Sequence, residues 1–273
     1  MKRLNILPNA YYNFLKNRKC DYHKHKDKIK REIVNIYHSH NGTDGYRTMH
    51  AYLLRRGYNI SRITVHKYMN TELQLFSIVR KRKPDYEYGA PHKVFENKLH
   101  QDFKAESINQ KWCTDFTCLF LTNGSKRYNC TIIDLYDRSV IASITDKHIT
   151  AELAKRTLQK AIDSQPGLDP SCLILHSDQG SQYTSKEFTE YCESVGITQS
   201  MSKAGYPYDN APMERYYNTL KNELINHHYY HSEKELYTSI EEFAYVNYNH
   251  ARPHAYNNYK TPVEARYGAH NIS

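Results

Sequence analysis

The order of strand-like and helical patterns in residues 110–224 limits the folds available to this chain. Three β-rich runs come first, parted by short turns: QKWCTDFTCLFL, KRYNCTIIDLYD and RSVIASIT. An amphipathic helix (TAELAKRTLQKAID), a short buried strand (SCLILH), a helix (SKEFTEYCESVG), a strand (ITQSM) and a third helix (APMERYYNTLKNEL) follow. The order β-β-β-α-β-α-β-α predicts an α/β domain with a mixed five-stranded sheet and flanking helices.

Three acidic residues lie at informative points of this pattern. Asp115 lies within the first strand among apolar side chains, where a carboxylate without a partner such as a cation is costly. Asp178 follows the strand SCLILH and precedes Gly180, at the carboxyl end where open sheets place ligands. Glu214 lies in the first turn of the third helix, which begins at Pro212. Carboxylates that come from two strands and a helix suit a shared divalent-metal site.

Each of these positions also has a purely structural interpretation. Asp115 fits a solvent-facing strand residue, Asp178 fits an ordinary turn residue before glycine, and Glu214 fits a residue that stabilises the helix dipole. Glu223 is the rival of Glu214. It lies nine residues further on, about 900° around the helix, so only one of the two faces the sheet.

Other charged residues near these motifs receive secondary interpretations. Lys221 lies seven residues after Glu214 on the same helical face, and we expect it to contact a phosphate. Asp134 and Asp137 flank a hairpin and are interpreted as turn residues. His176 is interpreted either as a packing residue or as a residue that orients Asp178.

The N-terminal third has helical periodicity. In residues 27–40, four apolar side chains recur at helical spacing: Ile29, Ile33, Ile36 and Tyr37. After NGTDG, a second helix, YRTMHAYLLRRG, carries Tyr46, Met49, Leu53 and Leu54 on one side and ends at Gly57. Ser61 is suited to cap a third helix, RITVHKYMNTE. The last two helices fit a helix-turn-helix whose recognition helix carries candidate DNA contacts at Arg62, Thr64, His66 and Lys67, although a purely structural bundle has the same pattern.

The charge of the chain is unevenly divided. Residues 1–100 hold 21 Lys+Arg against 8 Asp+Glu, a net charge of +13, whereas residues 101–273 have a net charge of −4. This asymmetry indicates a polyanion-binding arm on a catalytic body, or a basic surface kept for solubility. The run Arg80, Lys81, Arg82 and Lys83 before Pro84 is interpreted as a linker that lies along phosphates, or as a solvated tether.

Several classes of protein are disfavoured. No apolar run approaches 18 residues, so no transmembrane helix and no membrane partner are expected, and the N-terminus lacks the pattern of a signal peptide. The six cysteines form no CxxC pair, so we expect reduced thiols and no zinc site. A tyrosine recombinase is considered because Arg252, His254 and Tyr256 lie close together in sequence. Residues this close in sequence do not readily surround one phosphate, so this class is disfavoured.

Four segments together resemble the DDE transposases of bacterial insertion sequences, which share the retroviral-integrase catalytic core. They are WxxDFT, HSDQGSQYTS, YDNAPMERYYNTLKNEL and YNHARPHAYNNYKTPVEARYG, and the resemblance covers roughly residues 27–268. It implies a ribonuclease H-like catalytic domain preceded by an all-α helix-turn-helix domain. The resulting segments are a basic helical arm (1–26), the helix-turn-helix (27–79), a linker (80–105) and the catalytic domain (106–268).

The resemblance also implies an activity. Asp115, Asp178 and Glu214 would be the catalytic triad and the ligands of two Mg²⁺ or Mn²⁺ ions. The enzyme would bind double-stranded DNA at the ends of a mobile element, then cleave and transfer strands, with Arg252 and His254 contacting DNA or the catalytic helix. It would act as a homo-oligomer in the bacterial cytoplasm, associated with the nucleoid. The chain also resembles the product of the second reading frame of such elements, which implies an upstream-frame product as partner, since the active enzyme of that group is commonly a frameshift fusion of the two.

Two other functions fit the same residues. One is a non-catalytic helix-turn-helix regulator of transposition, whose C-terminal domain is a relic or a dimerisation module. The other is a ribonuclease H-like nuclease that cleaves DNA but does not join it. Intact carboxylates at the family spacing disfavour the regulator, and the basic helix-turn-helix disfavours the plain nuclease.

Overall fold

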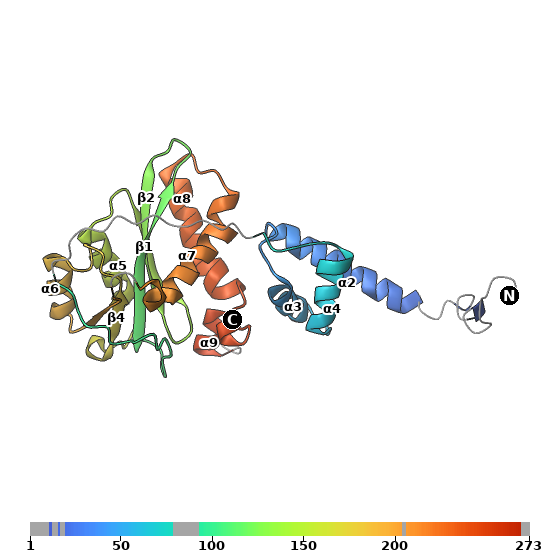
Figure 1. Cartoon of the computed structure of the whole chain (residues 1–273), viewed down its shortest axis with the longest axis horizontal. Coiled ribbons are helices and arrows are strands. Elements are labelled where there is room, and N and C mark those ends of the chain that lie inside the picture. The colour runs from blue at the N-terminus through green and yellow to red at the C-terminus, as the bar shows by residue number, and fades with distance from the viewer. Residues whose placement is uncertain (1–10, 13–15, 17–19, 79–92, 204–205, 269–273) are drawn as a thin grey trace. The chain divides into compact units, whose positions relative to one another are not determined.

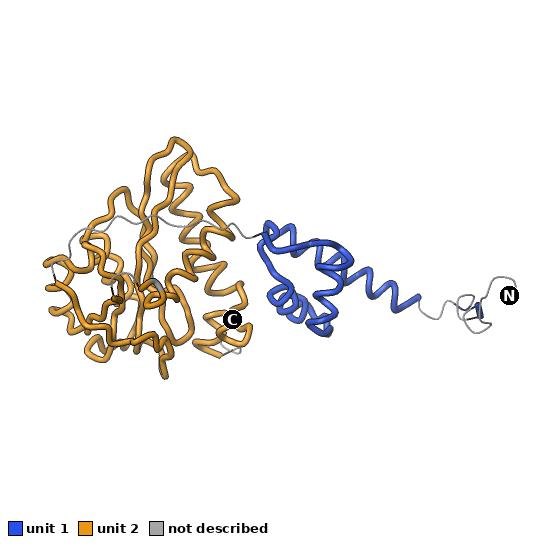
Figure 2. Tube along the Cα trace, in the orientation of Figure 1, with its two compact units in different colours: residues 1–79 blue, residues 80–273 orange. Residues whose placement is uncertain are grey.

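The chain folds into two compact units, residues 1–79 and residues 80–273 (Figure 2). A computed structural model describes residues 11–12, 16, 20–78, 93–203 and 206–268. Within these residues, no helix combines the length and the apolar character needed to cross a membrane. All six cysteines are free thiols.

The first unit is a small helical bundle. It contains α2 (Cys20–Ser39), α3 (Tyr46–Arg55) and α4 (Arg62–His66), and α4 continues directly into the π-helical η2 (Lys67–Glu72) (Figure 1). The core residues come from every one of these helices: Ile29, Ile33, Ile36, Tyr37, Met49, Leu53, Val65, Tyr68 and Met69. The helical spacing predicted from the sequence is therefore confirmed for α2 and, apart from Leu54, for α3.

The details of this bundle correct two predictions. The first helix begins at Cys20 rather than near residue 27, because its polar N-terminal end needs no core contact and Lys26 bonds to Glu72 of η2 at 2.9 Å. Leu54 was expected on the buried side of α3 but is 45% exposed, since Leu53 takes the core-facing position. The predicted end of α3 at Gly57 and the predicted Ser61 cap of α4 are confirmed. Gly57 has φ +81° and donates its N–H to Leu54 at 2.9 Å, while the Ser61 hydroxyl accepts the Thr64 N–H at 3.2 Å.

The second unit is built on one mixed five-stranded sheet. Its strands are β1 (Lys111–Phe120), β2 (Lys126–Asp134), β3 (Val140–Asp146), β4 (Ile174–Ser177) and β5 (Thr198–Met201), in the spatial order β3-β2-β1-β4-β5. The pairs β1/β2 and β2/β3 are antiparallel, whereas β1/β4 and β4/β5 are parallel. The number of strands and their order along the chain are those predicted from the sequence.

Helices cover both faces of this sheet (Figure 1). α5 (Ala151–Asp163) and α6 (Lys186–Ser194) lie on one face, and α7 (Ala211–Glu223) lies on the other. Three further helices follow α7: α8 (Glu233–Glu241), the π-helical η6 (Glu242–Ala251) and α9 (Pro262–Tyr267). None of them was predicted from the sequence. In η6 the i+5 hydrogen bonding shifts the residues that face the sheet, so the sequence lacks the periodicity of an α-helix. Short 3₁₀ turns complete the unit: η3 (Pro170–Cys172), η4 (Pro207–Asn210), η5 (Ile225–His227) and η7 (Ala255–Asn257).

Alternation along β1 determines which side chains meet which helices. Trp112 packs into the core shared with α5 and α6, whereas Cys113 packs into the core shared with α7 and η6. Because successive strand residues point to opposite faces, Asp115 points to the same face as Cys113. On β4, Leu175 belongs to the α5/α6 core and Ile174 packs against the α7/η6 core. This alternation places the acidic positions of both strands on the α7 face.

The turn interpretation of Asp134 and Asp137 was incomplete. Each accepts a local backbone N–H, from Tyr136 at 2.9 Å and from Ser139 at 2.8 Å respectively. Both are fully buried and both bind the Arg266 guanidinium of α9, at 3.1 and 2.6 Å. Burial and the charge of Asp137 raise the pKa of Asp134, while Arg266 opposes this shift. The two aspartates therefore hold the last helix against the end of β2.

Candidate active site

Asp115 lies on β1, and Asp178 follows the neighbouring parallel strand β4. The β1/β4 register pairs Cys113 with His176, and each aspartate comes two residues after its member of this pair. Neighbouring strands are roughly 4.8 Å apart and residues at matching positions share a face. Asp178 lies directly beyond Ser177, the last residue of β4, at the carboxyl end predicted for a ligand site. The register therefore predicts neighbouring positions for the two carboxylates, and the charge of Asp178 raises the pKa of Asp115.

A tight turn holds the Asp178 carboxylate. Its Oδ1 accepts the backbone N–H of Gly180 at 2.9 Å. A β-carbon at Gly180 would lie 2.9 Å from this same oxygen, closer than real contacts allow. The next residue, Gln179, donates its side-chain amide to the Ser202 carbonyl at 2.9 Å, which connects this turn to the end of β5. Glycine is therefore required at position 180 by the position of the carboxylate.

Helix α7 carries Glu214 in its first turn, where the Glu214 side chain is exposed, and other residues of this helix contact β1. Tyr217, one turn after Glu214, donates its hydroxyl to the Asp115 carbonyl at 2.6 Å, and the Asn129 carbonyl lies 3.1 Å away. At the start of the helix, the Asn210 amide donates to the Thr114 carbonyl at 3.2 Å. These bonds fasten the first turns of α7 to the part of β1 that carries Asp115.

Asp209, Asn210 and Tyr217 support this site through hydrogen bonds, and none of the three was predicted to do so from the sequence. The buried Asp209 carboxylate accepts bonds from Asn97 at 3.0 Å, Gln101 at 2.8 Å and the Lys203 backbone N–H at 3.0 Å. Burial alone would raise the pKa of Asp209, but these donors lower it below its usual value. The signal was the polar pair Asp209-Asn210 directly before Ala211-Pro212, which marks a fixed helix start rather than a simple turn.

The electrostatics of the three carboxylates indicate one shared environment. Burial raises the pKa of Asp115 well above its usual range, and the negative charges of Asp178 and Glu214 raise it further. Burial also raises the pKa values of Asp178 and Glu214. Lys221 lies within the field of Asp115: burial lowers the pKa of Lys221, and the charge of Asp115 raises it. A cation at this place would relieve the repulsion among the carboxylates.

The donor chemistry of this place fits a hard divalent cation. The protein donors that reach the two aspartate carboxylates are backbone N–H groups, Phe116 at 2.7 Å to Asp115 and Gly180 at 2.9 Å to Asp178. Carboxylate oxygens with free lone pairs are the ligands that Mg²⁺ and Mn²⁺ prefer. In the described part of the chain, no three His, Cys, Asp or Glu side chains are already gathered into a metal-ligand group. The ligand atoms therefore have the right chemistry but are not preassembled.

Glu223, the rival of Glu214, has a different role. The Arg252 guanidinium binds its carboxylate in a bidentate manner, with N–O distances from 2.8 to 3.0 Å. Arg252 thus contacts the helix that carries Glu214. His254 is buried against the Tyr248 carbonyl at 3.3 Å, and burial together with the charge of Arg252 lowers its pKa to about 3. Tyr256 donates to the Leu135 carbonyl at 3.4 Å, so these residues do not surround a common site.

His176 packs rather than orienting Asp178. Its Nδ1 lies 2.9 Å from the Ser200 hydroxyl of β5. Burial lowers its pKa to about 4, so the ring is neutral at physiological pH. It ties β4 to β5 just before the carboxylate turn.

The predicted DNA contacts lie in different parts of the chain. Arg62, His66 and Lys67 are exposed on α4 and the start of η2. Thr64 is half-buried, with its hydroxyl 2.9 Å from that of Ser61 in the helix cap. Lys221 belongs to the carboxylate site instead. The basic run at positions 80–83 lies outside the described residues.

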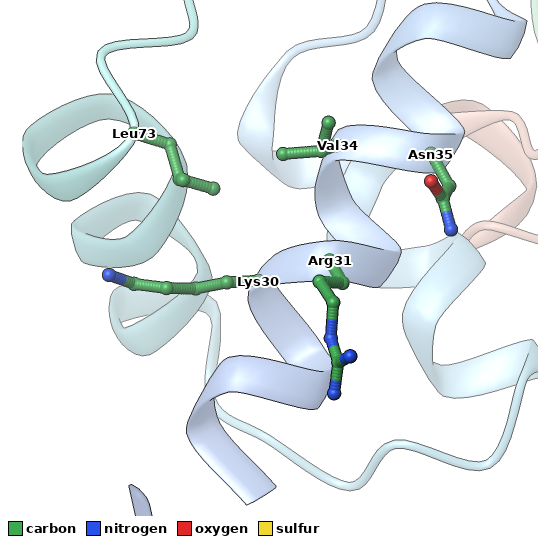
Figure 3. Close-up of a pocket in the computed structure, with 5 residues that line it drawn as sticks. All are labelled: Lys30, Arg31, Val34, Asn35 and Leu73. Atoms are coloured by element: carbon green, nitrogen blue, oxygen red, sulfur yellow. The ribbon is translucent and has the colours of Figure 1, made fainter. Parts of the chain in front are cut away.

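A separate hollow of about 250 Å³ lies on the first unit, between α2 and the end of η2 (Figure 3). Val34 and Leu73 supply apolar side chains, while Lys30, Arg31 and Asn35 complete its lining. Lys30 forms an ion pair with Glu72 at 2.6 Å. None of the three carboxylates of the candidate site contributes to this hollow.

The mixed five-stranded sheet with helices on both faces, preceded by a helical unit, defines a protein with an integrase-like core fold and an HTH-like domain. Residues 105–207 match a family model described as "Integrase core domain", residues 195–262 match a second model of the same description, and residues 24–83 match an "HTH-like domain". The chain belongs to the family of insertion-sequence transposases with an integrase core. The expected ribonuclease H-like fold and its N-terminal helical domain are thereby confirmed.

Similar proteins agree with this assignment. The putative transposase InsK for insertion sequence element IS150 of Escherichia coli (strain K12) is 34% identical over 82% of this chain and 77% of its own length. The transposase for insertion sequence element IS904 of Lactococcus lactis is 31% identical over 88% of this chain and 95% of its own length. Among solved structures, the simian T-cell lymphotropic virus intasome in complex with PP2A regulatory subunit B56 gamma has a TM-score of 0.50 at 16% identity, covering 88% of this chain and 76% of that one. That likeness concerns the fold alone.

Proposed function

We propose that this chain binds the ends of its mobile DNA element and catalyses strand cleavage followed by strand transfer. The observation that carries the proposal is the β1/β4 register, which brings the part of β1 before Asp115 next to the end of β4 before Asp178, while the first turn of α7 bears Glu214. Burial raises the pKa values of all three carboxyl groups, and the charges of Asp178 and Glu214 raise that of Asp115 further, so these acidic groups suit the binding of divalent cations.

The three carboxylates act as metal ligands in this proposal, not as nucleophiles. Asp115, Asp178 and Glu214 would hold Mg²⁺ or Mn²⁺, as two ions; when bound, the ions activate the attacking oxygen and stabilise the leaving oxygen. Lys221, beside Asp115, neutralises part of the charge of an incoming phosphate. In the first reaction, water attacks a phosphodiester at the element end and a 3′-hydroxyl leaves. In the second, that 3′-hydroxyl attacks a target phosphodiester and a target 3′-hydroxyl leaves, so one bond forms for each bond broken.

The first unit binds the element ends in this proposal. Residues 1–79 carry 15 Lys+Arg against 5 Asp+Glu, which favours a polyanion. Arg62, His66 and Lys67 project from the helix that continues into η2, as a recognition helix requires. Two ends must be brought together, so the chain acts as a homo-oligomer on DNA, with the upstream-frame product as a further partner.

Asp178→Asn tests the catalytic part of the proposal. The substrate is a duplex that carries the inverted repeats flanking the gene, and strand transfer into a plasmid is measured in Mg²⁺ and in Mn²⁺. We expect the variant to lose cleavage and joining while it retains DNA affinity, measured by fluorescence anisotropy. Asp163→Asn, at an exposed position of α5, is the matched control and should retain both.

The same assay separates the alternatives. Joined products made by Asp178→Asn would remove this residue from the mechanism. Shortened strands without joined products from the unmodified chain would instead indicate a nuclease. DNA binding without any cleavage by the unmodified chain, tested with and without the upstream product, would indicate a regulator.

A further inference from the structure

Ile63 is exposed at a position where an isoleucine does nothing for the fold. Its side chain is 82% exposed, more than any other large hydrophobic side chain described in residues 11–78. It is the second residue of α4, directly after the Ser61 cap and Arg62. The core of this unit is built from other residues of the same helix, Val65, Tyr68 and Met69. A single exposed apolar side chain is common on protein surfaces, so its surroundings decide its meaning.

The surroundings of Ile63 are basic. Around the helix axis, His66 lies at ~40°, Ile63 at ~100° and Lys67 at ~140° from Arg62. All four side chains are exposed, and the buried residues of the helix lie on the opposite side. Ile63 is therefore the apolar centre of a basic face.

The helix leaves no acidic charge on this face. Glu72, the acidic residue of η2, pairs with Lys26 at 2.8 Å and Lys30 at 2.6 Å, both from α2. The His66 ring packs edge-on against Tyr46, with ring centroids 5.0 Å apart. This face is thus complementary in charge to a polyanion, and its one apolar group needs an apolar partner within that polyanion.

Duplex DNA offers one such partner in the major groove. The C5-methyl group of thymine is the apolar group on the base edges there, and residues near the start of a recognition helix reach those edges. Flanking cations contact phosphates and fix the position of the helix without reading sequence. An isoleucine in a helix has essentially one χ1 rotamer, so it loses little side-chain freedom on contact.

We propose that Ile63 is a specificity residue that packs against the C5-methyl group of a thymine in the element end. The inference rests on the proposed binding of element ends by the first unit. It assigns base discrimination at one position to an apolar contact, which the basic residues alone cannot supply. Ile63 contributes nothing to the chemistry of strand transfer.

The experiment replaces single thymines by deoxyuridine, which removes only the methyl group. The full chain first selects duplexes from a random-sequence library, and the selected consensus is then synthesised with each thymine changed in turn. Dissociation constants are measured for the unmodified chain, for Ile63→Ala and for the control Leu54→Ala, an exposed apolar position on α3. Unfolding temperatures should match among the three because both side chains are exposed.

We expect the unmodified chain and Leu54→Ala to lose affinity about 4-fold at one thymine position, the effect of one buried methyl group. Ile63→Ala should bind the thymine and deoxyuridine duplexes equally. If Ile63→Ala and the unmodified chain lose affinity equally on replacement of thymine by deoxyuridine, or if no thymine position affects affinity, the proposed role of Ile63 is overturned. The proposed binding of element ends would remain. Absence of any consensus would overturn sequence-specific binding itself. A change of oligomeric state in Ile63→Ala, with unchanged DNA affinity, would reassign the residue to a protein interface.

Discussion

The Tyr217 hydroxyl donates a hydrogen bond of 2.6 Å to the backbone carbonyl of Asp115. This bond joins α7, which carries Glu214, to β1 at Asp115 itself. Position 217 is 5% exposed, so water does not readily replace the bond. The relative position of Asp115 and Glu214 therefore depends on this tyrosine.

Tyr217→Phe should lower both stability and activity. The change leaves buried carbonyl groups without their donor, which costs about 1–3 kcal/mol in the free energy of unfolding. A small displacement of Glu214 should reduce strand transfer by roughly 10- to 100-fold. Urea unfolding and the plasmid assay measure the two effects. Tyr229→Phe, at a position 83% exposed, is the matched control; equal activity of both variants would contradict the role of Tyr217.

Asp115→Asn should stabilise the metal-free protein. The pKa of Asp115 is raised in the folded state, so the folded chain binds the proton more tightly than the unfolded chain does. The contribution of Asp115 to the free energy of unfolding is most favourable below the pKa that this group has in the unfolded chain. It is lost as pH rises through the pKa that the group has in the folded chain. At pH 7 in EDTA the variant should therefore have a higher free energy of unfolding than the unmodified chain, and the difference should vanish near pH 3.

Metal should reverse that ranking. Mg²⁺ at 100 times its dissociation constant stabilises a protein that binds it by about 2.7 kcal/mol. The unmodified chain should gain this stability in calorimetry, whereas Asp115→Asn should gain little. Equal stabilisation of both proteins by Mg²⁺ would place the ion elsewhere.

Gly180→Ala should displace the Asp178 carboxylate. The added β-carbon would lie 2.9 Å from Oδ1, and φ at this glycine is not positive, so the contact rather than backbone strain is responsible. Strand transfer should fall by roughly 10- to 100-fold. Gly45→Ala is the control, because its β-carbon meets nothing within 4 Å and its φ is −83°. Normal transfer by Gly180→Ala would show that the turn is not required in this form.

Arg252→Lys should weaken the end of α7 despite keeping the charge. Lysine cannot reproduce the bidentate contact with Glu223, because its ammonium is a single point donor. We expect a loss of about 1–2 kcal/mol in the free energy of unfolding. A double-mutant cycle with Glu223→Gln measures the coupling, and additive effects would indicate that the pair contributes nothing measurable.

Local features of the fold were predictable from sequence, because they depend on neighbours within a few residues. The Ser61 cap, the Gly57 helix end and the alternation that directs Asp115 to one face are of this kind. The ion cluster of Arg266 with Asp134 and Asp137 was not predictable, since its members lie about 130 residues apart. The bond from Tyr217 to Asp115 spans 102 residues and gives no periodic signal. Support of a site by distant polar groups becomes visible only when the chain has folded.

The Arg266 contacts join the last helix of the second unit to the end of β2. Asp134 closes the strand next to the one that carries Asp115, and its counter-charge arrives from the last helix. Loss of the segment after a protease cut between positions 224 and 262 would leave the buried carboxylates of Asp134 and Asp137 without the Arg266 guanidinium. Limited digestion there should collapse the sheet as a whole rather than trim it to a smaller stable fragment.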